Sequence, residues 1–109
     1  MGMDMNKLMQ QMGQMQEEMQ KAQDELEHET VESSAGGGMV TVTANGAGEI
    51  RQIKIDPKAI DPDDPEMLAD MVLAAVNEAI RSARSLQESK LGGLAGGALG
   101  GLGLPGLGQ

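Results

Sequence analysis

The side chains that most often catalyse reactions or bind metals are few in this sequence and poorly grouped. Cysteine is absent, and the one histidine, His28, lies among glutamates. A histidine without a second histidine, a cysteine or a nucleophile nearby makes a poor metal site and a poor catalytic base. We therefore interpret His28 as an exposed bystander and expect neither a metal site nor a disulfide.

Two other clusters resemble functional motifs only loosely. Asp61, Asp63 and Asp64 could ligate a cation, but they lack the spacing and closing glutamate of an EF-hand, and turn formation with helix capping explains them. The glycines of residues 36–38 could cradle a phosphate, but no Lys-Ser or Lys-Thr pair follows. We predict that the chain is not an enzyme and takes no cofactor or small-molecule substrate.

The basic side chains remain as candidates for binding. Because the sequence has no aromatic residue, it lacks a stacking platform for single-stranded nucleic acid. A bound nucleic acid would have to be a duplex held through its phosphates. The net charge of -9 favours the alternative, in which these side chains form ion pairs with the surplus acids. The candidates are Arg51, Lys54, Lys58, Arg81, Arg84 and Lys90.

Acidic and basic residues are segregated along the chain. Residues 1–32 hold two lysines and eight acidic residues, and residues 61–70 hold five acids and no base. Residues 49–58 and 78–90 each carry a small excess of base. The N-terminal segment is therefore the part of the chain least suited to contact DNA.

A first helix is predicted from Met5 to Leu26, with Asp4 as its N-cap. Its apolar residues are spaced alternately by three and four, which is the period of a coiled coil. Gly13 interrupts the helix at a cost of about 1 kcal/mol relative to alanine. The stripe is narrow and favours a seam with another helix over packing on the chain's own core. It consists of Met5, Leu8, Met12, Met15, Met19, Ala22 and Leu26.

A small antiparallel sheet is predicted to follow. Residues 39–44 alternate in polarity, Asn45-Gly46 indicates a hairpin because both residues tolerate positive φ, and residues 49–55 supply the returning strand. Ile53 and Ile55 lie on one face of that strand. Residues 30–33 could add a third strand at the edge.

A second helix is predicted to begin with Asp64 as N-cap and Pro65 in the first position. Its apolar face is broad, which suits packing on a sheet, and alanines at 75, 79 and 83 allow close approach of another backbone. We expect the helix to end near Lys90.

Residues 91–109 are uncharged and include nine glycines, whose backbone entropy opposes a helix. We therefore predict a domain of residues 1–90 and a disordered Gly/Leu-rich tail of residues 91–109. We do not expect this tail to insert into a membrane.

The size of the domain favours self-association. Without aromatic side chains, a core of this length buries little apolar surface, and contact with a second copy would add to it.

Three segments carry a family resemblance: MNKLMQQMGQMQEEMQKAQDEL, GGGMVTVTANGAGEIRQIKIDPKAI and DPDDPEMLADMVLAAVNEAIRSA. In this order they resemble the YbaB/EbfC family of bacterial nucleoid-associated proteins. The resemblance runs from Met5 to Lys90, and its most specific part is the string from Gly38 to Pro57. It agrees with an α+β fold, in which a long N-terminal helix, a small antiparallel sheet of two to three strands and a long C-terminal helix follow one another.

The resemblance implies a homodimer in the cytoplasm and nucleoid. It would bind double-stranded DNA with low sequence specificity and alter DNA conformation in nucleoid organisation and gene regulation. Because the family's contacts lie mainly on projecting helices, Lys7 and Lys21 join the basic candidates. The shared dimer body would involve the second helix, through Met71, Val72, Ala75, Val76, Ala79 and Ile80.

A protein-interaction module without direct DNA binding is the alternative. The first helix offers only Lys7 and Lys21 among many acids, and its Met-lined stripe could grip a protein client.

Overall fold

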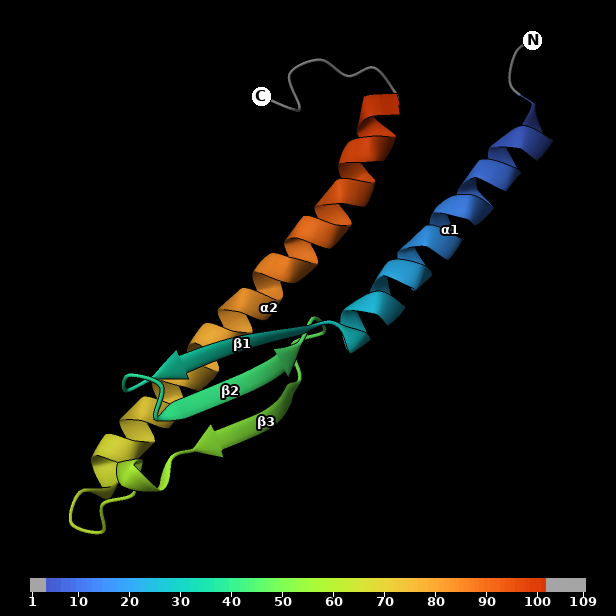
Figure 1. Ribbon diagram of the computed structural model, residues 1–109. Helices are drawn as coiled ribbons and strands as arrows, with labels where there is room; N and C mark the ends of the chain where they lie inside the picture. The colour runs from blue at the N-terminus through green and yellow to red at the C-terminus, as the bar shows by residue number, and fades with distance from the viewer. Residues whose placement is uncertain (1–3, 102–109) are drawn as a thin grey trace.

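The computed structural model describes the backbone of residues 4–101 and the side chains of residues 4–94, and it has the predicted α+β order (Figure 1). The three strands form one antiparallel sheet in the order β1-β2-β3, so the optional third strand is present. The elements are α1 (Met5–His28), β1 (Thr30–Ala35), β2 (Val40–Asn45), β3 (Ile50–Ile55), the short 3-10 helix η1 (Pro57–Ala59) and α2 (Pro65–Gly101).

Both helices begin where their capping residues predict. Asp4 Oδ1 accepts a hydrogen bond from the Asn6 amide at 3.0 Å, which satisfies one of the free amides at the start of α1. Asp64 Oδ1 accepts from the Met67 amide at 3.2 Å, and Pro65 occupies the first position of α2. The two predicted N-caps are confirmed.

α2 ends later than predicted. It continues past Lys90 to Gly101, although Gly92 and Gly93 weaken a helix. Leu91 and Leu94 are half-buried, and Leu91 lies with Leu26 of α1 around a cavity of about 320 Å³. Partial burial of Leu91 and Leu94 stabilises the first of the extra turns, which propensity alone does not favour. The rest of the predicted tail, residues 102–109, lies outside the described residues.

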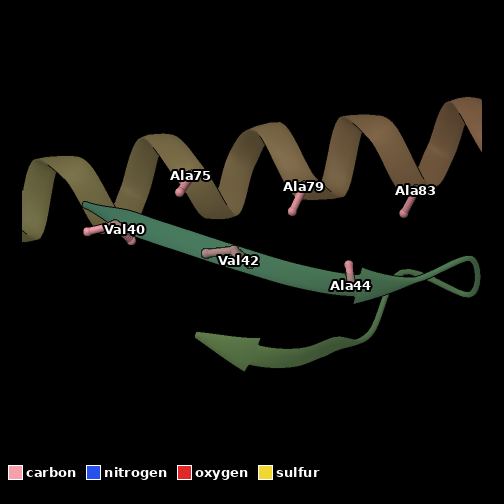
Figure 2. Packing of buried hydrophobic residues seen from close by; sticks show 6 residues of the cluster. All are labelled: Val40, Val42, Ala44, Ala75, Ala79 and Ala83. Atoms are coloured by element: carbon pink, nitrogen blue, oxygen red, sulfur yellow. The ribbon is translucent and has the colours of Figure 1, made fainter. Parts of the chain in front are cut away.

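The core is the contact between α2 and β2. Val40, Val42 and Ala44 point from β2 toward α2, and all three are fully buried (Figure 2). The small side chains of α2 bring the helix backbone close to the strand, as the sequence predicted. These side chains are Ala75, Ala79 and Ala83.

This packing bears on the predicted dimer surface. Ala75 and Ala79 have no exposed surface in the single chain because they lie against β2. The other four candidates are half-buried, and the assignment of all six to a dimer contact stays a prediction. The half-buried four are Met71, Val72, Val76 and Ile80.

β3 is not covered by α2, which lies over β1 and β2 (Figure 1). Ala44 pairs with Ile50 and Thr43 pairs with Gln52, so Arg51 is an extra residue in β3 and forms a β-bulge. The bulge brings Ile50 onto the same face as Ile53 and Ile55, which is the face that β2 turns toward α2. All three isoleucines are exposed, by 37–44 %.

The predicted hairpin between β2 and β3 is confirmed, but not through positive φ at Asn45 and Gly46. Neither Asn45 nor Gly46 has a positive φ, and the left-handed residue is Gly48, with φ of +90°. The Asn45 side chain shapes the loop instead: its Oδ1 accepts from the amides of Ala47 at 3.1 Å and Glu49 at 2.9 Å. The Asn45-Gly46 pair therefore predicted the hairpin correctly, but not the backbone conformation of its loop.

Candidate nucleic-acid interface

The structure divides the eight predicted phosphate contacts into two groups. Three form ion pairs with carboxylates. Arg51 lies 3.4 Å from Glu49, and Arg81 lies 2.8 Å from Glu78. Lys90 pairs with Glu25 in α1 and with Glu29, the first residue after α1. The other five are exposed and form no ion pair with another described residue. They are Lys7, Lys21, Lys54, Lys58 and Arg84.

Lys54 belongs to a polar surface on the side of the sheet away from α2, which we call the outer face. Its partner in β2 is Thr41, which in turn pairs with Ser34 of β1. Gln52 pairs with Thr43 on the same side. Ammonium, hydroxyl and amide groups of this kind donate hydrogen bonds to phosphate oxygens.

Lys7 and Lys21 stand in a different environment. They lie on α1, where no described acid pairs with either of them, but where negative charge predominates. That charge opposes the approach of a polyanion to this helix. The acids of α1 are Glu17, Glu18, Asp24, Glu25 and Glu27.

Lys90 ties α1 to α2. Its Nζ lies 2.9 Å from Glu25 Oε2 and also donates to Glu29 Oε1, and only 19 % of the side chain is exposed. Hydrogen bonds to Glu29 and Glu25 raise the pKa of Lys90, and the hydrogen bond from Lys90 lowers the pKa of Glu25. Because two carboxylates occupy its ammonium group, Lys90 is a poor candidate for a phosphate contact.

The β2–β3 loop makes a second tie to α1, which sequence reasoning missed. The Gly46 amide donates to the carbonyls of Leu26 at 2.7 Å and Glu29 at 2.8 Å, and Asn45 Nδ2 donates to the carbonyl of Glu27 at 3.1 Å. The last carbonyls of a helix lack partners within the helix, so this loop caps α1. A Cβ on Gly46 would lie 2.7 Å from the Leu26 oxygen, which explains the glycine.

The remaining candidates of the sequence have local structural roles. His28 Nδ1 lies 2.8 Å from the Asp24 carbonyl oxygen, one turn back in α1. Asp61 Oδ1 accepts from the Asp63 amide at 2.9 Å, as expected of a turn before α2. Residues 36–38 have positive φ and connect β1 to β2. Within residues 4–101, no group of three potential metal ligands lies together and no helix is long and apolar enough to cross a membrane.

Comparison with known proteins decides the family. Residues 1–98 match the model of the YbaB/EbfC DNA-binding family. The matched range includes α1, the sheet and most of α2. The chain belongs to the YbaB/EbfC family. The predicted resemblance is therefore confirmed.

Two relatives in this family are named nucleoid-associated protein. The one from Saccharopolyspora erythraea is 50% identical, over 95% of this chain and 94% of its own length, and the one from Streptomyces avermitilis is 53% identical, over 95% and 91%. The fold matches the crystal structure of an uncharacterized protein from Helicobacter pylori with a TM-score of 0.70 and 26% identity. That match covers 90% of this chain and 99% of the other.

The tie through Lys90 can be tested in this YbaB/EbfC member by Lys90→Gln. At neutral pH we expect a lower midpoint of urea unfolding than in the native chain, because Glu25 and Glu29 lose their cation. The lowered pKa of Glu25 means that the stabilisation is complete above the ordinary carboxyl pKa and is lost as the pH falls through the folded-state value. The raised pKa of Lys90 means that it is also lost as the pH rises through that group's folded-state value.

The control is Lys58→Gln, which removes the same charge from an exposed site. It should leave the midpoint nearly unchanged. An equal decrease for Lys90→Gln at neutral pH and at a pH where the glutamates are protonated would show that the ion pairs are not the cause.

Proposed function

We propose that this chain binds double-stranded DNA as a homodimer with low sequence specificity, and that it alters DNA conformation in the organisation of the nucleoid and in gene regulation. The family match, together with the names of its relatives, supports DNA as the partner. The observation that carries the proposal beyond the family is the outer face, where exposed Lys54 lies among hydroxyl and amide groups; the acid on this face, Glu32, lies two strands away on β1, opposite Thr43. The family match does not favour the alternative of an interaction module without DNA binding.

The composition of the outer face supports weak specificity. Lys54 and its neighbours Thr41, Thr43 and Gln52 suit phosphate contacts, which fix a protein on a duplex but carry no sequence information. Arg51 and Lys58 lie on β3 and just after it, and both are exposed. A surface of this kind binds through charge, so its affinity falls steeply with salt.

The exposed side of β3 supports the homodimer. An edge strand offers unpaired amides and carbonyls, and here Ile50, Ile53 and Ile55 add an apolar strip on the side facing α2. A second copy brings an identical edge and strip, which is the complement that a two-fold interface requires. Pairing at β3 would bring two copies of Lys54 near the centre of one dimer. This proposal moves the main dimer contact from α2 to β3.

Lys54→Gln tests the DNA surface. We expect binding to weaken to a similar degree on unrelated duplexes, and the slope of log affinity against log salt to fall by about 1 for each phosphate that the lysine no longer neutralises. Fluorescence anisotropy of labelled duplexes at low salt measures both quantities.

Lys7→Gln is the matched control, because it removes the same charge from α1, and it should weaken binding less. If the native chain fails to bind any duplex at roughly micromolar concentration and low salt, DNA binding itself is refuted. If Lys7→Gln weakens binding as much as Lys54→Gln, the outer face is not the main contact.

Ile53→Asp tests the dimer surface. Ile53 is exposed in the single chain, so the fold should persist, but a charge in the apolar strip should raise the dissociation constant of the dimer on the order of a hundredfold. Sedimentation equilibrium measures this constant. Gln52→Asp adds the same charge to the opposite face of β3 and should change it little. An unchanged dimer in Ile53→Asp would place the interface elsewhere.

A further inference from the structure

We propose that the exposed part of α1, residues 5–19, pairs with the same segment of another copy and so links separate DNA-bound dimers. We call this segment the arm. The inference rests on the proposed function, because it adds a second self-association surface to a dimer that already holds DNA.

The arm carries an apolar stripe that nothing in the described part of the chain covers. At the C-terminal end of the heptad seam, Ala22 and Leu26 are only 5 % and 4 % exposed, because this end of α1 lies against α2 and the β2–β3 loop. Further toward the N-terminus α1 projects away from the sheet (Figure 1), and the same seam becomes exposed by 43–70 %. The exposed seam residues are Met5, Leu8, Met12, Met15 and Met19.

An uncovered helix of this kind is marginal in water. Isolated helices of about 12–15 residues gain too little from backbone hydrogen bonds to offset nucleation, and Gly13 weakens this one further. Burial of the Met and Leu side chains against a second helix supplies the missing stabilisation. The narrow stripe with spacings of three and four fits a coiled-coil seam.

The side chains that flank the seam indicate which helix covers it. Met9, Gln11 and Gln16 occupy uncharged positions beside the seam, and Glu18 is the charged residue among its flanks between Met5 and Met19. Lys7 and Glu17 lie farther from it. A basic partner helix would find almost no carboxylate to pair with, whereas an identical arm meets matching Met side chains and neutral amides without like charges in opposition. The occupant is therefore a second copy of the arm.

The arm and the β3 edge are separate surfaces. The seam of α1 meets α2 at Leu26 and Leu91, and the end of α1 meets the β2–β3 loop, while β3 turns its free edge away from β2. A copy that dimerises through β3 therefore still presents its arm. Two different self-complementary surfaces on one chain join dimers into larger assemblies.

The length of the exposed seam sets its strength. Two heptads are fewer than the three or four of a persistent coiled coil, so the arms pair weakly in free solution. Dimers bound along DNA are held at a high effective concentration, which favours weak contacts between neighbours. The arms thus connect neighbouring dimers or separate duplex segments when DNA is present.

The absence of cysteine allows a direct test by disulfide crosslinking. Met12→Cys places a thiol in the seam, and Gln14→Cys places one on the solvated side of the same helix as a matched control. Under mild oxidation we expect Met12→Cys to crosslink at least about tenfold faster than Gln14→Cys, and an unrelated duplex to increase the difference. Light scattering should give the crosslinked species a mass above that of the uncrosslinked dimer.

Three results would overturn the inference. The first is equal crosslinking by the two variants, with and without duplex. The second is a crosslinked species with the mass of the uncrosslinked dimer, which means that the arms pair inside one dimer. The third is disappearance of the Met12→Cys crosslink on adding a stoichiometric helical peptide of Leu and Lys, which means that the arm prefers a basic partner. If the native chain binds no duplex while Met12→Cys still crosslinks at high concentration into species above the dimer mass, the proposed function fails and the pairing of arms is supported.

Discussion

The capping of α1 by the β2–β3 loop is the interaction on which the arrangement of the molecule depends. Gly46 donates its amide to the carbonyls of Leu26 and Glu29, and buried Asn45 donates to the carbonyl of Glu27. These bonds satisfy backbone groups that would otherwise be left without partners where α1 meets the sheet. They join the first helix to a loop far along the chain, so the direction of the arm is set by the sheet.

The rest of the architecture follows from this junction and from the alanines of α2. Because Ala75, Ala79 and Ala83 let the helix lie close on β2, α2 covers β1 and β2 and leaves β3 open. The same helix continues past the junction, where Lys90 holds Glu25 and Glu29. The polar outer face, the apolar edge of β3 and the exposed arm are therefore three separate surfaces of one chain.

Sequence patterns predicted what depends on neighbours along the chain. The capping residues Asp4 and Asp64 marked both helix starts, and the alanine row of α2 marked its contact with the sheet. The same patterns did not predict the features that depend on residues distant in the sequence. The partners of Lys90 lie more than sixty residues away in sequence, and the face on which Ile50 lies depends on a bulge at Arg51. The Asn45-Gly46 pair located the hairpin, but its capping of α1 needs the fold. The sequence identified the basic candidates, but it did not show which of them form ion pairs within the chain and which are free to contact phosphate.

The junction is tested most directly by the distance between the C-terminal part of α1 and the sheet. Spin labels on cysteines replacing Gln20 in α1, which lies between the arm and the junction, and Gln52 in β3, in chains diluted into unlabelled protein, report this distance by pulsed electron paramagnetic resonance. We expect one narrow distribution in the native background and a broad one after Asn45→Ala, which removes the bond to Glu27 and loosens the loop. A broad distribution in the native background, or a narrow one that Asn45→Ala leaves unchanged, would show that the loop does not fix the direction of α1.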